Sequence, residues 1–474
     1  MTDMAEFIWI DEKKYPEYQK SAENAKYGIV RFTNDFSLPG VDKIKVKIYA
    51  DAKYTLYVNG QFIGVGPASA GGDYVFKKMT YCFFDEYEIP VPNGKINIIA
   101  DVTTVSTALE EIVFDNCCFF LYASDFSGNE LFGTDSNWKA QLLAQRKELN
   151  FTDYTAVEEP ILNAIVSLKA AKSHNMLPKQ TENLEYKTVY PTKFEKITVE
   201  PQKSVDLCLD FDKIYAAYPT ISVNAQGKVI LSCETSEIDG VGVFCEDIVT
   251  DKSVTHFSPR MRSIGQIKIK LKNESDKPAT IDNVYITAVS YPVKNETGFE
   301  CSDKLINKIY DVCMHTLKIC RQSIHLDSPK HREPLACTGD YFIENLMECM
   351  NIYDLTLTKS DIFKTSQFIE LQNGAMFHTT YSLIYPEWVY DCYMYSDDQK
   401  ILVTAQKSLY ALINKFDTYF SSDGLIEKAP NYMFVDWIDI DEFNLHHPPK
   451  ALGQSVLCMF YYNALNVINK IFFC

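Results

Sequence analysis

The hydrophobic pattern changes its period near residue 298, and this change limits the possible folds more than any other feature. Before it, apolar and polar residues alternate, as in the segment Ile44-Lys45-Val46-Lys47-Ile48. A period of two is typical of strands with one buried face. From Ser302 onward, apolar residues recur at the spacing of helices. The chain is therefore predicted to be a multidomain β + α protein, with its β domains first.

The β region is predicted to form two sandwiches. Asn59-Gly60 stands between two apolar runs, which is a strong hairpin signal because both turn positions need positive φ. The short alternating strands around it predict an N-terminal β-sandwich over residues 1–190 and a second β-sandwich over residues 191–297. Residues 165–200 show no clear periodicity, and we interpret them as a connection.

The helical region, residues 298–474, contains six predicted helical segments: 302–322, 340–352, 360–373, 381–395, 398–419 and 449–472. Ser302 and Ser360 are expected to be N-caps. Consecutive helices joined by loops favour a helical toroid or a solenoid. No sequence repeat recurs at a fixed spacing, which disfavours a tetratricopeptide-type array.

Composition excludes several kinds of partner. The formal net charge of −17 argues against nucleic-acid binding and against docking on anionic membranes, so a neutral substrate fits better. The N-terminus lacks the basic and apolar regions of a signal peptide, and no apolar run is long enough to span a membrane. The 14 cysteines include no CxxC pair. We expect a reduced, cytoplasmic protein without a metal site or a cofactor.

The densest group of reactive side chains lies in the segment from Asp327 to Asp340, between two predicted helices. It holds three carboxylates, an arginine and a histidine, and loops of this kind often carry function. Carboxylates held close together raise one another's pKa, so that one can stay protonated and donate a proton. A solvated polar loop in which Asp340 caps a helix is an equally supported interpretation.

This segment resembles the catalytic signature of glycoside hydrolase family 78, the α-L-rhamnosidases, which is approximately D-[CS]-P-x-x-R-[DE]-R-L-G-W-x-G-D. The matching positions, in order, are Asp327, Ser328, Pro329, Arg332, Glu333, Leu335, Gly339 and Asp340. The sequence departs from the signature at three positions. Pro334 replaces an arginine, Ala336 a glycine, and Cys337 an aromatic residue that is usually tryptophan.

The resemblance implies a role for each matching residue. Glu333 takes the position of the general acid, and Asp327 and Asp340 take the positions that bind rhamnose hydroxyls. Arg332 is expected to contact the sugar as well. The implied fold is an (α/α)6 toroid of the six-hairpin glycosidase type. The implied reaction is inverting hydrolysis, which removes terminal α-L-rhamnose from plant glycosides or oligosaccharides.

Weaker likenesses follow the same order over residues 50 to 460. They comprise the hairpin around Asn59-Gly60, the segment Asp135-Ser136-Asn137-Trp138-Lys139, and the segment Gly298-Phe299-Glu300-Cys301-Ser302-Asp303. Asp436-Trp437 resembles the family's sugar-stacking position and is predicted to bind substrate. Trp388 is predicted to pack in the core, and the adjacent His446 and His447 are read as loop residues because neighbouring side chains diverge.

Six helices are half of the twelve that a toroid needs, and no segment after Glu333 resembles the family's general-base loop. The sequence therefore predicts that about half of the toroid is present, that the base is lacking, and that turnover is poor. Helix faces left without partners would favour a homo-oligomer. The alternatives are a non-catalytic carbohydrate-binding remnant and a different (α/α)6 glycosidase. A protein-interaction solenoid is a weaker one, since it gives no reason for the Asp327–Asp340 cluster.

Overall fold

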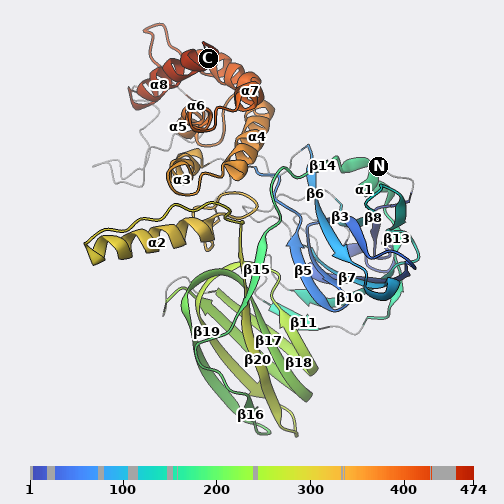
Figure 1. Cartoon of the computed structure of the whole chain (residues 1–474). Helices are drawn as coiled ribbons and strands as arrows, with labels where there is room; N and C mark the ends of the chain where they lie inside the picture. The colour runs from blue at the N-terminus through green and yellow to red at the C-terminus, as the bar shows by residue number, and fades with distance from the viewer. Residues whose placement is uncertain are drawn as a thin grey trace. The chain divides into compact units, whose positions relative to one another are not determined.

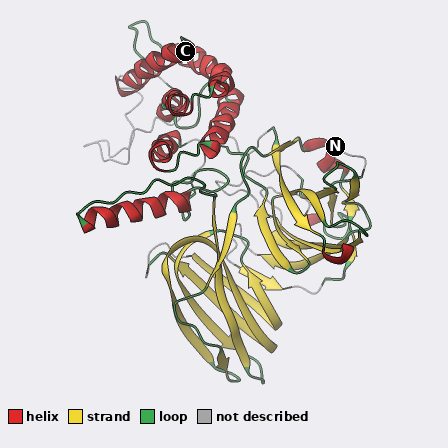
Figure 2. Ribbon diagram, in the orientation of Figure 1, coloured by secondary structure: helices red, strands yellow, loops and turns green. Residues whose placement is uncertain are grey.

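The computed structural model describes residues 4–18, 27–72, 80–104, 116–146, 153–156, 159–238, 244–332, 335, 337–426, 429 and 455–473. Two compact units divide the chain. Unit 1 comprises Met1–Ser69 and Thr80–Tyr291, and unit 2 comprises Ala70–Met79 and Pro292–Cys474. Unit 1 is built from strands and unit 2 from helices (Figures 1 and 2). The prediction of a multidomain β + α protein is confirmed.

Unit 1 contains two sheets. The smaller has the strand order β13-β1-β8-β3-β6-β14, with β9 paired to β8. Its strands are β1 (Ile8–Trp9), β3 (Lys43–Asp51), β6 (Cys82–Pro90), β8 (Cys118–Ser124), β9 (Glu130–Gly133), β13 (Ile165–Val166) and β14 (Met176–Pro178). Two short 3-10 helices, Pro16–Tyr18 and Pro92–Gly94, and helix α1 (Leu168–Ser173) connect strands of this unit.

The larger sheet runs through both predicted sandwiches, in the order β15-β20-β17-β18-β11-β10-β2-β7-β4-β5. Three further strands branch from it: β12 pairs with β10, β16 with β20, and β19 with β17. The strands are β2 (Tyr27–Ser37), β4 (Lys53–Val58), β5 (Gln61–Gly66), β7 (Lys95–Thr103), β10 (Lys139–Arg146), β11 (Asp153–Ala156), β12 (Leu162–Asn163), β15 (Glu185–Val189), β16 (Ile197–Val199), β17 (Ser204–Ser236), β18 (Phe244–Phe257), β19 (Arg262–Asn273) and β20 (Ala279–Ser290). The parallel pair of β11 and β18 joins the two halves.

The alternating pattern produces the buried faces that the sequence predicts. Ile44, Val46 and Ile48 are fully buried in one core, and a second core lies among the strands of residues 199–286. Asn59 (φ 49°) and Gly60 (φ 76°) form the expected turn, at which Val58 pairs with Gln61. The hairpin prediction is confirmed.

The interpretation of residues 165–200 as a connection is wrong. This segment contains helix α1 and the four strands β13, β14, β15 and β16. The strands are only two to five residues long. These strands combine polar and apolar residues without a clear alternation. Each pairs at the margin of a sheet, where one side faces solvent and little apolar surface is needed.

Unit 2 contains helices at all six predicted segments. They are α2 (Lys304–Cys320), α3 (Thr338–Asn351), α4 (Thr356–Leu371), α6 (Tyr385–Ser396), α7 (Gln399–Asp417) and α8 (Ser455–Phe472), with α5 (Thr379–Ser382) as a separate short helix. Two predicted caps are wrong. Asp303 caps α2 through its side chain, and α4 begins at Thr356, so that Ser360 is buried inside the helix.

The helices bury one face each, but α2 does so only through its C-terminal half, at Met314, Leu317 and Cys320. Trp388 on α6 is fully buried, so its predicted place in the core is confirmed. Helix α2 instead leaves an apolar face in solvent, where Leu305, Ile309 and Val312 are each more than half exposed. Among the described residues, no helix is long and apolar enough to cross a membrane.

Candidate active site

The loop between α2 and α3 carries the signature residues, and a tight turn shapes its first half. The hydroxyl oxygen of Ser328 accepts a hydrogen bond from the backbone N–H of His331 at 3.0 Å. The backbone oxygen of Ser328 accepts one from the N–H of Arg332, also at 3.0 Å. This turn places Nδ1 of His331 at 3.1 Å from Oδ2 of Asp327. Asp327 is thereby held by its own loop.

Arg332 occupies the strained end of the turn. Its φ of 61° lies in the left-handed region, which side chains other than glycine rarely adopt. The residue is 3% exposed, and Leu335 beyond it is fully buried. Glu333, the predicted acid, lies outside the described residues together with Pro334 and Ala336. The loop enters and leaves the segment around Glu333 through buried anchors.

Helix α3 positions the second aspartate of the signature. Cys337 is the N-cap residue, and the N–H of Asp340 in the first turn donates to its backbone oxygen at 3.0 Å. The interpretation of Asp340 as the cap is therefore wrong. Although Asp340 is exposed as a residue, desolvation of its carboxyl group and the nearby Asp327 carboxylate raise its pKa. Asp327 and Asp340 are thus electrostatically coupled.

Close packing explains why glycine stands at position 339 of the signature. A Cβ on Gly339 would lie 2.8 Å from the ring of Tyr381, closer than side-chain carbons approach. The hydroxyl of Thr338 donates to the backbone oxygen of Tyr381, so the start of α3 is fixed directly against the segment of α5. This close contact sets the direction in which α3 carries Asp340.

Cys337, which replaces the family's aromatic residue, points into the protein. It is 4% exposed, and its Sγ lies 4.0 Å from Nδ1 of His378. Burial lowers the pKa of His378 to about 4, so this imidazole is neutral at physiological pH. The rings of His378 and Tyr381 lie 5.5 Å apart. Aromatic groups beside the start of α3 therefore come from this second segment.

A buried network of charges lies directly behind the loop. His325 Nε2 is 3.1 Å from Oε1 of Glu348, and its Nδ1 is 3.0 Å from Oδ2 of Asp361. Arg321 also pairs with Glu348, and Lys364 Nζ lies 3.1 Å from Oδ1 of Asp361. The side chains of all five are at most 2% exposed.

Within this network His325 carries the proton between two carboxylates. Burial alone would lower its pKa, but Glu348 and Asp361 outweigh that effect and raise it to about 10. The backbone N–H of His325 also donates to Asp361 at 2.9 Å. Since His325 is two residues before Asp327, α4 anchors the start of the Asp327–Asp340 loop through Asp361.

Glu344 links the loop to this network. It stands one helical turn after Asp340 and one turn before Glu348, on the same side of α3. The residue is 9% exposed, and its Oε2 has no hydrogen-bond partner among the described residues. Burial, with the charges of Glu348 and Asp340, raises the pKa of Glu344 well above its ordinary value despite His325. Burial therefore favours the protonated form of Glu344.

Comparison with known domains identifies the helical part. Residues 294–472 match the family described as bacterial alpha-L-rhamnosidase 6 hairpin glycosidase domain. This segment is thus similar to the α-L-rhamnosidases over the length of that domain. The resemblance to the bacterial α-L-rhamnosidases is therefore confirmed at the level of the domain, residues 294–472. No curated protein matches the chain.

Solved rhamnosidases share the fold of this chain at low sequence identity. The family 78 rhamnosidase of Bacillus sp. GL1 is 12% identical with a TM-score of 0.80, over 98% of this chain and 74% of that one. The α-L-rhamnosidase of Dictyoglumus thermophilum is 16% identical with a TM-score of 0.67, over 98% and 57%. That of Streptomyces avermitilis, solved with L-rhamnose, is 12% identical with a TM-score of 0.66, over 94% and 46%.

A segment far from the signature also contributes to the rhamnosidase-type unit. Ala70–Met79 follows strand β5 but belongs by its contacts to unit 2. Gly71 is buried with φ +77°, and a Cβ there would lie 2.8 Å from Cδ1 of Leu335 and 3.2 Å from Cβ of Lys364. The backbone at Gly71 therefore lies directly against Leu335, two residues after Glu333 in sequence.

The other predicted site residues have different outcomes. Asp436 and Trp437 lie outside the described residues, as do His446 and His447. The reasoning from sequence missed the buried network altogether. One signal was available, because Asp340, Glu344 and Glu348 repeat a carboxylate every four residues along α3.

Proposed function

We propose that this protein is an inverting α-L-rhamnosidase that releases terminal rhamnose from plant glycosides or oligosaccharides. One observation carries the proposal beyond the family match: Asp327 and Asp340, at opposite ends of the loop that bears Glu333, are close enough that one raises the pKa of the other. Two coupled carboxylates around a third are suited to gripping vicinal hydroxyls while the third donates a proton.

In this proposal Glu333 protonates the leaving oxygen. An inverting enzyme also needs a carboxylate base, separated from the acid by about 6.5–9.5 Å so that a water molecule fits between them. Asp327 and Asp340 bind rhamnose hydroxyls. Arg332, which is buried at the end of the turn, holds the loop and contacts the sugar. Asp436 and Trp437 complete the pocket, with the tryptophan ring against an apolar sugar face.

The finer description of the architecture is also part of the proposal. The helices of unit 2 form part of an (α/α)6 toroid, supported by the six-hairpin description of the matching family. Unit 1 comprises two sandwich domains, residues 1–190 and 191–297, supported by its two separate apolar cores. We further propose a cytoplasmic location, supported by the free thiols of the described cysteines.

The experiment compares Glu333→Gln with the wild-type chain on two α-L-rhamnosides, a natural glycoside and an aryl rhamnoside with a good leaving group. General acid catalysis contributes about 10²–10⁴-fold, so turnover of the natural glycoside is expected to fall by at least ~10²-fold. The aryl substrate needs little protonation and loses much less. Glu300→Gln, an exposed glutamate of the same unit, is the matched control and keeps wild-type turnover.

Equal losses on the two substrates would refute the assignment of Glu333. The anomeric form of the first product, followed by proton NMR during hydrolysis by the wild-type chain, tests the stereochemistry separately. Inversion gives the β anomer first. Formation of the α anomer first would refute the inverting mechanism while leaving the substrate class intact.

A further inference from the structure

The two ends of the larger sheet of unit 1 meet. In the strand order of this sheet, β15 and β5 are the terminal strands. The hydroxyl of Tyr186 on β15 donates to the backbone oxygen of Val65 on β5 at 3.1 Å and accepts from the N–H of Val65 at 3.0 Å. The rings of Tyr186 and Phe62 lie 5.0 Å apart, edge to face. The sheet thus curls until its edges are joined by side chains.

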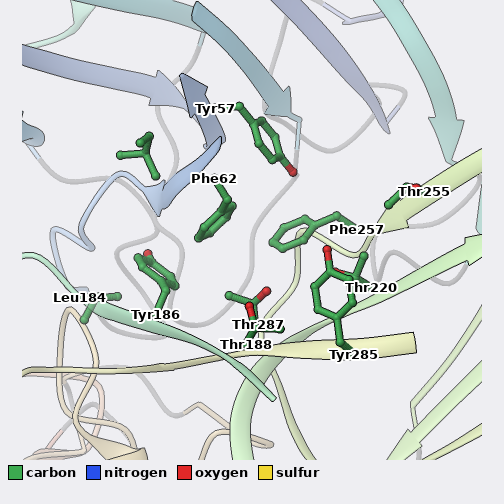
Figure 3. A pocket seen from close by; sticks show the side chains of 11 residues that line it. Tyr57, Phe62, Leu184, Tyr186, Thr188, Thr220, Thr255, Phe257, Tyr285 and Thr287 are labelled. Atoms are coloured by element: carbon green, nitrogen blue, oxygen red, sulfur yellow. The ribbon is translucent and has the colours of Figure 1, made fainter. Parts of the chain in front are cut away.

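A cavity of about 550 Å³ lies where the edges meet (Figure 3). Five aromatic residues and four threonines dominate its lining: Tyr57, Phe62, Tyr186, Phe257 and Tyr285, with Thr188, Thr220, Thr255 and Thr287. Ile63 and Leu184 complete it. The described lining contains no charged side chain. Its size lies in the range of sites for small molecules, about 300–1,000 Å³.

A smaller cavity of about 90 Å³ adjoins it and shares Tyr57, Thr255 and Phe257. Its lining adds Arg31 and Asp101, which form a bidentate ion pair through two hydrogen bonds of 2.7 Å each. The smaller cavity therefore places a paired guanidinium and carboxylate next to residues that also line the larger one. Such a pair can exchange hydrogen bonds with hydroxyl groups without favouring a charged ligand.

The lining matches one ligand class. Sugar rings have apolar C–H faces that pack on aromatic rings and hydroxyls that need donors and acceptors around their edges. The rings of Tyr57, Phe62, Phe257 and Tyr285 are only half-buried, so ring surface remains for a ligand. Thr188 and Thr255 are exposed and bring hydroxyls to the same space. Burial and Asp101 raise the pKa of Tyr57, so its phenol stays a neutral donor.

We propose that this cavity is a second carbohydrate-binding site, which takes a neutral saccharide of one or two rings. It lies wholly within unit 1 and shares no residue with the Asp327–Asp340 loop. The ligand class follows from the lining and does not depend on the proposed catalytic activity. Such a site would hold a sugar that the active site does not cleave, and would raise the effective concentration of an oligosaccharide substrate.

The test is calorimetric titration of the full chain carrying Asp327→Asn and Asp340→Asn, which removes the proposed active-site contacts. The probes are L-rhamnose, D-galactose, D-glucose and cellobiose, with D-glucuronate as the charged probe. At least one neutral sugar is expected to bind, and D-glucuronate to bind at least about tenfold more weakly. Tyr57→Ala and Tyr285→Ala are each expected to weaken that binding about tenfold, the scale of one aromatic contact.

Phe126→Ala removes a half-exposed ring on the smaller sheet of unit 1 and serves as the matched control, with unchanged affinity expected. If Tyr57→Ala fails to fold by circular dichroism, Thr255→Ala at the exposed rim and Tyr57→Phe replace it, each with weaker binding expected. The proposal is overturned if none of the neutral sugars binds, if D-glucuronate binds as well as they do, or if the pocket variants bind like Phe126→Ala.

Discussion

Nε2 of His325 lies 3.1 Å from Oε1 of Glu348, and neither side chain has any exposed surface. The second ring nitrogen faces Asp361, so both nitrogens meet carboxylates, and Arg321, Lys364 and the protonated Glu344 surround the group. An imidazolium fits this position and a neutral imidazole does not, because the neutral ring has only one donor. The protonation of one buried histidine therefore supports the start of the Asp327–Asp340 loop.

We predict that the stability of the helical unit depends on pH through His325. Its pKa is raised from 6.5 to about 10 in the folded protein. The stabilisation is therefore complete below pH 6.5 and is lost as the pH rises toward 10. His325→Gln should lower the free energy of unfolding at pH 6 by about 3–5 kcal/mol, as for a broken buried ion pair. Denaturant unfolding, followed by circular dichroism at several pH values, measures this free energy of unfolding.

His331→Gln is the control for this prediction, because the His331 side chain also faces a carboxylate but is 61% exposed. It should change the free energy of unfolding by less than about 1 kcal/mol. A His325→Gln protein with the wild-type stability at pH 6 would show that His325 does not carry the proton.

Glu344→Gln is predicted to leave stability at pH 7 unchanged or to raise it. The pKa of Glu344 is raised above its ordinary value of 4.5, so its contribution is favourable below that pH and is lost as the pH rises. Glutamine keeps the shape of the protonated acid and cannot ionise. The paired substitution Glu348→Gln should instead destabilise by about 3–5 kcal/mol, because it leaves Arg321 and His325 without their shared carboxylate. Thermal unfolding measures the stability of both variants. A Glu344→Gln protein less stable than Glu348→Gln would contradict the raised pKa of Glu344.

Gly71→Ala is predicted to disturb the loop that carries Glu333. The methyl group would meet Leu335 at 2.8 Å, in addition to the backbone strain at φ +77°. Gly424 has a similar φ of +74° with no atom nearby, so Gly424→Ala measures the strain alone, about 1–2 kcal/mol. Gly71→Ala should cost about 1–3 kcal/mol more than Gly424→Ala and should lower rhamnoside turnover. Equal stability and turnover in the two variants would show that Leu335 yields freely.

Thr220→Val is predicted to stabilise unit 1. The Thr220 hydroxyl is buried and has no hydrogen-bond partner among the described residues, which is a cost of about 1–3 kcal/mol that valine avoids. Thr134→Val is the opposite control, because that buried hydroxyl donates to Glu6 at 2.7 Å and accepts from Leu121 at 3.1 Å. The midpoints of thermal unfolding should move in opposite directions. A lowered midpoint for Thr220→Val would reveal a partner of its hydroxyl.

The fold could be predicted wherever one face of an element is continuously apolar. The strand containing Ile44 and Val46 and the helix containing Leu409 and Leu412 follow directly from their periods. Strand β15 could not be predicted, because Tyr186 is its one large aromatic side chain and the partner of that ring, Phe62, is distant in sequence. An edge strand of this kind is specified by contacts that exist only once the sheet has curled.

The candidate site likewise has a part that could be predicted from the sequence and a part that could not. The Asp327–Asp340 loop is contiguous, so its residues could be recognised as a group. The pairing of His325 with Asp361 could not, because 36 residues separate them and each type is ordinarily found on the surface. The sequence does not show that His325 and Asp361 are buried, and it is this burial that makes them a rigid support for the loop.

The place of Gly71 bears on how this protein can be divided in the laboratory. Expression of residues 292–474 alone would remove the strip Ala70–Met79, which follows strand β5 but packs with the helices. Leu335 and Lys364 would then lose the contact that the backbone at Gly71 makes with them. One cut in the sequence therefore does not separate the two units, because unit 2 is formed from two separate stretches of the chain. A fragment meant to reproduce unit 2 therefore has to include Ala70–Met79 as well as residues 292–474.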